Sequence, residues 1–475
     1  MSAGLFATLR AGFPADLTAP ALVEPSGQTL SYAALLARSG GIAAALRDRG
    51  LGPGDRMVVQ TGKSVEALLL YLAAVRAGIV YVPLNPGYTR AELDYFLQDS
   101  EPGLFVDDVA LAELATAPPT DFAEPELGTE DIAAILYTSG TTGRSKGAML
   151  SQGNLASNAG ALIREWRFTA IDRLVHALPI FHVHGLFVAT HCALGSGASM
   201  LWLPAFDADA ILDALPHSTA LMGVPTFYTR LLARPELTPE LCAGMRLFVS
   251  GSAPLSAETH REFEGRAGHR ILERYGMTET GMLTSNPYAG ERLAGSVGPA
   301  LPGVDVRIAE PDAGGVGGIE VRGPNVTGGY WRNSEKTVES FTEDGWFITG
   351  DLGRVDERGY VWIVGRAKDL IISGGFNVYP AEVEAAIESI DGVAEVAVVG
   401  APHPDLGEAV VAVVVGSASA EHVMDALKDQ LAAYKRPKLV QIKTTLPRNA
   451  MGKIEKAVLR RDMVGAFAVV QPAQD

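Results

Sequence analysis

The stretch RMVVQTGKSVEALLLYLAAVRAGIVYVPL, residues 56–84, decides the fold class. It begins with the strand-like run RMVVQ, continues with the helical pattern SVEALLLYLAAVRAG and ends with a second strand-like run, IVYVPL. A strand, a helix and a strand in this order are typical of folds whose sheets are largely parallel. The same alternation continues to about residue 200, so the sequence predicts an α/β fold built of layers.

Two later regions differ in character. Residues 294–331 carry short strand patterns between Gly and Pro turns, which predicts a β-rich subdomain without helices. Beyond it, strand patterns alternate with the helical runs AEVEAAIESI (381–390) and HVMDALKDQLAAY (422–434), which predicts a compact α+β unit. We therefore expect an N-terminal domain of residues 1–365 and a C-terminal domain of residues 366–475.

Composition narrows the class of partner. Hydrophobic residues make up 47% and charged residues 20% of the 475 residues, as in an ordinary globular protein. A net charge of −16 disfavours nucleic acid and membrane surfaces as partners. The segment from Lys428 to Arg461, however, contains ten basic residues and only two acidic ones. This basic segment fits either a solvated helix face or a site for a compact polyanion such as a nucleotide or a coenzyme.

Neither a membrane span nor a disulfide framework is expected. The longest apolar stretch is broken by Arg76, and the N-terminus lacks the ordered regions of a signal peptide. Cys192 and Cys242 lie fifty residues apart without metal-like spacing, so buried thiols are expected. The sequence predicts a cytoplasmic protein.

The sharpest motif is YTSGTTGRSKG, from Tyr137 to Gly147, directly after the apolar run DIAAIL. Glycines allow backbone N–H groups to approach phosphate oxygens, while hydroxyls add donors and Lys146 adds positive charge. The spacing is not GxxxxGK[ST], which excludes the common P-loop. The motif predicts a phosphate-binding loop, with a plain surface loop as the alternative.

This motif resembles a signature of the AMP-forming acyl-CoA synthetases of the adenylate-forming superfamily. Four more motifs in the same order carry the resemblance: YGMTET (275–280), TGD (349–351), GRAKDLI (365–371) and PRNAMGK (447–453). The resemblance implies that a carboxylate reacts with MgATP to give an acyl-adenylate and pyrophosphate, and that the acyl group then passes to coenzyme A. It also implies a large N-terminal domain with a β-rich subdomain and a small, mobile C-terminal domain.

The resemblance assigns roles around ATP and Mg²⁺. Residues expected at the β- and γ-phosphates are Thr138, Ser139, Thr141, Thr142 and Lys146. Residues expected around adenine are Gly251, Ser252, Ala253, Pro254, Tyr275 and Gly276. Thr278 would bind the α-phosphate, Glu279 would ligate Mg²⁺, and Asp351 would accept from the ribose hydroxyls with Arg366 beside it.

The resemblance also assigns roles in the C-terminal part. Lys453 would bond the substrate carboxylate and the α-phosphate during adenylation, where negative charge develops. Lys368 would be the hinge between the two half-reactions. Residues expected along the path of coenzyme A are Ser373, Gly374 and Gly375 for the thiol, and Lys435 and Arg436 for the phosphates.

Candidates for the acyl pocket are His182, with His184 two residues on, and Met277; His182 is also a catalytic candidate. For each histidine a packed core role is the alternative. Arg230 and Arg292 suggest a second substrate carboxylate, because fatty or aryl acids have little use for cations near the pocket. The strings around them look closest to the malonyl-CoA synthetase branch, whose substrates are malonate and methylmalonate.

Other functions remain open at this point. The chain could be a short-chain, medium-chain or aryl acyl-CoA ligase in which both arginines are surface residues. It could also adenylate an amino acid for a separate carrier protein, or be a non-catalytic nucleotide-binding relative. Turnover of ATP and coenzyme A over a panel of acids separates these possibilities.

Overall fold

The computed structural model describes residues 4–138, 145–448 and 453–467. It contains two compact units. The first comprises the chain up to Val306 together with Val321–Ile348, and the second comprises Arg307–Glu320 together with the chain from Thr349 on. The expected domain boundary between residues 365 and 366 stays a prediction, because compactness groups residues 349–365 with the second unit.

The smaller sheet of the first unit contains the βαβ segment expected from residues 56–84. Helix α3 starts at the cap residue Ser64 and ends at Gly78, whose left-handed φ of 72° suits glycine. All its residues except Glu66 are buried, which explains why apolar residues dominate its sequence apart from Arg76. The strand order is β5-β3-β4-β6-β7, parallel except for β6 and β7. The bounds are β3 Arg56–Val59, α3 Val65–Ala77, β4 Val80–Pro83, β5 Leu104–Val106, β6 Ile132–Thr138 and β7 Lys146–Ser151.

Eight strands form the larger sheet, in the order β13-β12-β11-β10-β8-β9-β1-β2. The strands from β12 to β1 run parallel, and the edge strands β13 and β2 are antiparallel to their neighbours. The bounds are β1 Pro20–Val23, β2 Thr29–Ser31, β8 Arg173–His176, β9 Ser199–Trp202, β10 Ala220–Gly223, β11 Leu247–Ser250, β12 Leu272–Met277 and β13 Gly281–Ser285. The predicted α/β layers are confirmed.

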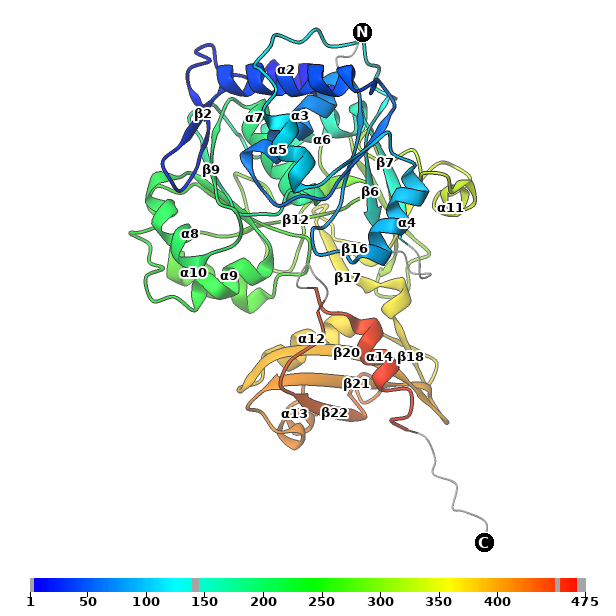
Figure 1. Ribbon diagram of the computed structural model, residues 1–475. Coiled ribbons are helices and arrows are strands. Elements are labelled where there is room, and N and C mark those ends of the chain that lie inside the picture. Colours follow the sequence, from blue (N-terminus) through cyan, green and yellow to red (C-terminus); the bar gives the residue numbers. More distant parts are fainter. Residues whose placement is uncertain (1–3, 139–144, 449–452, 468–475) are drawn as a thin grey trace. The chain divides into compact units, whose positions relative to one another are not determined.

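Helices cover both sheets, and α6 contacts strands of each. Figure 1 shows α2, α3 and α5 side by side, with α8, α9 and α10 grouped elsewhere on the same unit. The α-helices are α1 Leu5–Arg10, α2 Tyr32–Asp48, α4 Arg90–Ser100, α5 Asp108–Ala115, α6 Gln152–Glu165, α7 Thr190–Gly195, α8 Ala208–Ala214, α9 Pro225–Leu232, α10 Ala257–Ala267 and α11 Ser334–Glu339. A π-helix, η1, spans His184–Ala189, and a 3-10 helix, η2, spans Leu215–His217.

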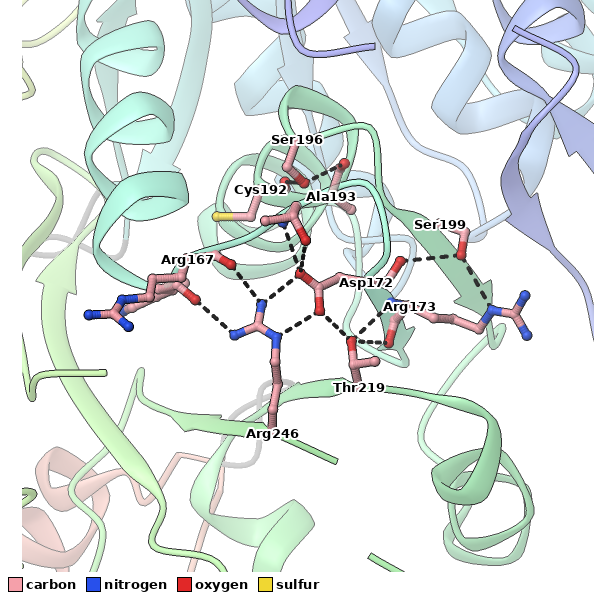
Figure 2. A network of polar contacts seen from close by, with 11 residues as sticks. Arg167, Asp172, Arg173, Cys192, Ala193, Ser196, Ser199, Thr219 and Arg246 are labelled. Atoms are coloured by element: carbon pink, nitrogen blue, oxygen red, sulfur yellow. Dashed lines mark hydrogen bonds and ion pairs between the residues drawn. The ribbon is translucent and has the colours of Figure 1, made fainter. Parts of the chain in front are cut away.

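A polar network fixes the amino ends of the parallel strands in the larger sheet (Figure 2). The carboxylate of Asp172, just before β8, accepts hydrogen bonds from Arg246 Nε at 2.7 Å and Nη2 at 2.8 Å. It also accepts from the Thr219 hydroxyl at 2.7 Å, while its main-chain carbonyl accepts from the Ser199 amide at 3.0 Å. One buried residue, through its carboxylate and its main-chain carbonyl, thereby joins the starts of β8, β9, β10 and β11.

A four-stranded sheet, in the order β14-β15-β16-β17, confirms the predicted β-rich subdomain. No helix falls within residues 294–331, all of which the structure describes. The bounds are β14 Asp305–Ala309, β15 Gly317–Arg322, β16 Phe347–Val355 and β17 Val361–Arg366.

The C-terminal part of the second unit is the expected α+β arrangement, with the order β19-β18-β21-β20 and β22 beside β21. Successive side chains of β20 and β21 point to opposite faces of the sheet. Val398 and Val410 therefore pack with α12 and α13, while Val399 and Val411 pack with α14. The bounds are η3 Ala367–Asp369, β18 Ile371–Ser373, β19 Phe376–Val378, α12 Pro380–Glu388, β20 Val393–His403, β21 Gly407–Gly416, α13 Ala420–Ala426, β22 Leu439–Lys443 and α14 Lys456–Asp462.

Helix α13 is shorter than the run 422–434 suggested. After Ala426 the chain forms turns that include backbone hydrogen bonds between residues three apart. The Lys428 amide donates to the Asp425 carbonyl at 3.1 Å, and the Gln430 amide donates to the Leu427 carbonyl at 3.3 Å. Leu427 stays buried in the core through these turns.

Two expectations about the core and the membrane are met. Cys192 and Cys242 are buried thiols, and burial raises the pKa of Cys242 to about 11. Within the described ranges, every helix is too short or too polar to cross a bilayer.

Candidate functional site

The carboxyl ends of the parallel strands gather most of the predicted residues of the first unit. Ligands of open α/β sheets bind at this edge. The segment with His182 and His184 follows β8, and helix α9 with Arg230 follows β10. Residues 251–254 follow β11, and Met277 ends β12. The topology therefore brings together motifs that lie up to about a hundred residues apart in sequence.

The two ends of the predicted phosphate loop are held by the β6–β7 hairpin. Thr138 pairs with Lys146 in the antiparallel register, and the Tyr95 hydroxyl donates to the Ser145 carbonyl at 2.7 Å. Ser139, Thr141 and Thr142 lie outside the described residues. Partial burial, helped by the neighbouring Lys336, lowers the pKa of Lys146.

Glu279 is the acidic member of this site and is only 6% exposed. Its Oε1 lies 3.4 Å from the Thr138 hydroxyl and accepts a hydrogen bond from the Tyr330 hydroxyl at 3.0 Å. Its main-chain carbonyl accepts from the Thr327 amide at 2.7 Å. The described ends of the predicted loop thus carry a hydroxyl and an ammonium group, with a buried carboxylate beside the hydroxyl. Sequence reasoning missed Tyr330, whose only signal was its place in the GGYW string.

The YGMTET motif forms the end of β12 and the turn into β13. Tyr275 and Gly276 lie at a bulge, and Thr278 lies in the turn beside Glu279. A Cβ on Gly276 would lie 2.1 Å from the Gly281 carbonyl oxygen, so the close approach of the strands requires glycine. The close packing at Gly276 therefore constrains the backbone of the turn that carries Thr278 and Glu279.

The GSAP segment turns sharply after β11. Ser252 adopts a left-handed φ of 72°, and its hydroxyl lies 3.4 Å from His184 Nδ1 on the π-helix. Ala253 is partly buried and Pro254 is exposed. A Cβ on Gly251 would lie 2.4 Å from the guanidinium carbon of Arg274, so glycine leaves room for that side chain.

Arg274 is a buried cation that sequence reasoning missed, although it directly precedes the YGMTET motif. It is 2% exposed, and its Nε and Nη2 have no hydrogen-bond partner among the residues that the structure describes. Burial lowers the pKa of Arg274 to about 10, so it stays charged at neutral pH. A charged group in this state calls for an anionic ligand.

The two arginines singled out from the sequence have different surroundings. Arg292 donates to the carbonyls of Pro287 at 3.2 Å, Tyr288 at 3.0 Å and Arg270 at 2.6 Å. Arg230 is exposed on α9, with its guanidinium 5.3 Å from the Phe206 ring centroid. The structure thus ties Arg292 to main-chain carbonyls, and the clasp by this pair stays a prediction.

The histidine candidates lie beside the carboxyl edge. His182 is half-buried, and its ring centroid is 4.4 Å from that of Phe181. His184 is buried and begins the π-helix. π-helical turns are frequent at functional sites.

In the second unit, Arg366 lies beside Asp351 as the sequence predicts, with 3.1 Å between Nε and Oδ1. Lys368 lies in the 3-10 turn η3, and burial together with Arg366 and Arg460 lowers its pKa. Lys453 is exposed in the loop before α14.

The predicted coenzyme A residues lie on a hairpin and a loop of the same unit. Ser373 ends β18, and Gly374 and Gly375 form the turn into β19 with φ of 58° and 81°. Lys435 Nζ lies 2.5 Å from Glu382 Oε1, and Arg436 Nε donates to the Leu431 carbonyl at 2.7 Å. The structure therefore gives both basic side chains internal partners.

Comparisons with known proteins agree with this geometry. The AMP-binding enzyme family matches residues 11–331, and the AMP-binding enzyme C-terminal domain matches residues 382–453. A malonate–CoA ligase of Arabidopsis thaliana is 35% identical, over 86% of this chain and 78% of that protein. An indoleacetate–CoA ligase of Aromatoleum aromaticum is 36% identical, over 91% and 93%.

Among solved structures, ATP-bound MatB from Rhodopseudomonas palustris superposes with a TM-score of 0.94. It is 53% identical, and the match covers 97% of this chain and 99% of that one. With the buried glutamate and the motifs at the carboxyl ends of the strands in place, the chain belongs to the AMP-binding enzyme family.

Proposed function

We propose that this chain is an AMP-forming ligase that joins malonate or methylmalonate to coenzyme A. A carboxylate oxygen attacks the α-phosphorus of ATP and displaces pyrophosphate, which gives an acyl-adenylate. The coenzyme A thiolate then attacks the acyl carbon, and AMP leaves. The relative named for malonate and the ATP-bound relative support this reaction.

The residues around the phosphate loop suit the first step. Thr138 and Lys146 provide a hydroxyl and a positive charge for the phosphates. Glu279 is one buried carboxylate, and Mg²⁺ is commonly held by one or two carboxylates together with substrate phosphates. Magnesium held there supplies positive charge for the pyrophosphate that leaves. Lys453 provides the ammonium that meets the developing charge at the reacting oxygens.

Buried Arg274 is the observation that carries the preference for a dicarboxylate. Two of its nitrogens have no hydrogen-bond partner within the described ranges, and Gly251 leaves space against its guanidinium. A second substrate carboxylate would accept hydrogen bonds from these two nitrogens, whereas an aryl or alkyl chain would leave them without an acceptor. We therefore assign the distal carboxylate to Arg274 in place of Arg292, and keep Arg230 as a second candidate.

The test measures pyrophosphate release with malonate, methylmalonate, succinate, acetate, octanoate and 4-coumarate, and confirms each thioester by mass. We expect the three-carbon dicarboxylates to be preferred. Losing an arginine that pairs with a buried carboxylate costs about 2–5 kcal/mol. Arg274→Met should therefore lower the malonate-to-acetate ratio of kcat/KM by about 30-fold or more.

Arg292→Met is the matched control, because its nitrogens serve main-chain carbonyls. It should leave that ratio within about twofold of the unchanged protein. Equal losses on malonate and acetate in Arg274→Met would refute the assignment.

An aryl acid is the alternative substrate, favoured by the equally similar indoleacetate–CoA ligase. Preference for 4-coumarate in the same panel would select it and would leave the adenylate chemistry intact. A cytoplasmic location stays part of the proposal, and cell fractionation tests it.

A further inference from the structure

We propose that Tyr330 is a positioning residue that orients the carboxylate of Glu279 toward a divalent cation arriving with ATP. This inference rests on the proposed use of a metal–nucleotide complex. It adds a residue from a different part of the chain, 51 positions after Glu279.

Glu279 is the carboxylate to which we assign the cation. Among the residues that the structure describes, no group of three or more His, Cys, Asp or Glu side chains could hold a metal ion. Glu279 is buried, and hard carboxylate oxygens suit Mg²⁺. Where one carboxylate supplies the protein's share of the ligands, its orientation decides where the cation lies.

Two hydroxyls meet the same oxygen of that carboxylate. The Tyr330 hydroxyl donates to Glu279 Oε1 at 3.0 Å, while the Thr138 hydroxyl is 3.4 Å from it. The shorter of the two contacts has the geometry of a good hydrogen bond, and the longer one is near the limit. Tyr330 therefore contributes the stronger restraint on the carboxylate.

Tyr330 can restrain Glu279 because its own backbone is held on both sides. Its amide donates to the Thr337 hydroxyl at 2.9 Å, and it forms a bridge with Ala148 of β7. The next amide, that of Trp331, donates to the Gly147 carbonyl at 2.7 Å. These contacts tie Tyr330 to the strand that begins at Lys146, at the end of the phosphate loop.

The ring of Tyr330 also faces the basic member of the site. Lys146 Nζ lies 5.9 Å from the ring centroid, within the range of a cation–π contact. One side chain thus contacts both the acidic and the basic groups expected at the phosphates.

The test compares Tyr330→Phe with Tyr32→Phe. Each variant keeps a buried ring and loses one hydroxyl, but the Tyr32 hydroxyl donates to the Ala198 carbonyl at 2.6 Å, away from the site. Binding of Mn²⁺ is measured by electron paramagnetic resonance with a non-hydrolysable ATP analogue. Because the lost bond is to a charged acceptor, we expect about tenfold weaker Mn²⁺ binding in Tyr330→Phe and no change in Tyr32→Phe.

Turnover gives a second readout. The Mg²⁺ concentration for half-maximal activity should rise about tenfold in Tyr330→Phe, while kcat at saturating Mg²⁺ stays within about twofold. Thr337→Val, which removes the acceptor of the Tyr330 amide, should shift Mn²⁺ binding in the same direction by a smaller factor. It keeps the test available if Tyr330→Phe does not fold.

Unchanged Mn²⁺ binding in both Tyr330→Phe and Thr337→Val would overturn the inference. Equal weakening of Mn²⁺ binding in the control Tyr32→Phe would also overturn it. So would a fall in kcat that saturating Mg²⁺ does not restore. Failure of the unchanged protein to bind Mn²⁺ with the nucleotide would instead overturn the proposed metal chemistry, which separates the two failures.

Discussion

Replacing Asp172 with asparagine should lower the stability of the larger sheet at the amino ends of its parallel strands. The carboxylate is 2% exposed and accepts from Arg246, Thr219 and the Thr169 amide, at 2.7 to 2.8 Å. Asparagine keeps the shape but removes the charge and turns an amide group toward these donors. Breaking a buried pair costs about 3–5 kcal/mol. Arg246 also donates to the carbonyls of Trp166 and Arg167, so we expect a loss near the lower limit, about 3 kcal/mol.

The loss should depend on pH in a defined direction. Burial alone would raise the pKa of Asp172, but hydrogen bonds from Arg246 and Thr219 prevail and lower it below its ordinary 3.8. A lowered pKa in the folded state means that the carboxylate stabilises the fold above about pH 4. This contribution is lost as the pH falls through the folded-state value. The difference between Asp172→Asn and the unchanged protein should be constant from pH 5 to 8 and shrink below pH 4.

Hydrogen exchange read by mass spectrometry is the suitable assay, because the chain has two compact units and global unfolding need not be one transition. Peptides covering residues 172–176, 199–202 and 219–223 should lose protection together. Asp94→Asn is the control, since the Asp94–Arg90 pair at 2.8 Å is exposed and should contribute under about 0.5 kcal/mol. An effect of Asp172→Asn as small as the control, or one that persists unchanged below pH 4, would refute the reasoning.

Two further predictions concern other parts of the chain. Lys453→Ala should lose adenylation by about 10²–10³-fold yet still convert supplied acyl-adenylate to the thioester, and equal loss of both half-reactions would exclude the proposed role. Burial raises the pKa of Glu273 from 4.5 to about 8, so ionisation opposes folding increasingly as the pH rises between these values. Glu273→Gln should match the unchanged protein in thermal unfolding near pH 5 and exceed it by a few degrees at pH 8. A larger advantage of the variant at pH 5 than at pH 8 would contradict this.

Local patterns were enough to predict part of the site. The run 56–84 predicts β3, α3 and β4 because burial on all sides leaves a mostly apolar pattern. The pairing of Asp351 with Arg366 was also expected, and the strand register places them opposite each other. The sequence predicts these features because the residues involved lie close together in the chain or within recognisable motifs such as TGD and GRAKDLI.

The remaining members of the site depend on distant parts of the chain. Tyr330 meets Glu279 only because β7, β12 and the GGYW segment converge, which no local periodicity records. The three main-chain carbonyls that accept from Arg292 come from Pro287, Tyr288 and Arg270, and its role at a substrate carboxylate stays a prediction. Arg274 was hidden because a charged residue in a strand ordinarily points to solvent.

In the larger sheet, the Asp172 network lies at the amino ends of the strands, and the segments after β8, β10, β11 and β12 lie at their carboxyl ends, which has a consequence for how this protein can change. The Asp172 network fixes the alignment of the strands at their amino ends, away from the proposed substrate site. Changes in the segments after β8, β10 and β11 therefore leave the contacts of this network in place. New acid specificities can then be sought at exposed positions of these segments, such as Arg230, while the buried Tyr228, whose hydroxyl donates to the Val249 carbonyl, is kept. Fold and selectivity become separately adjustable, and a library confined to these segments should retain a high fraction of folded members.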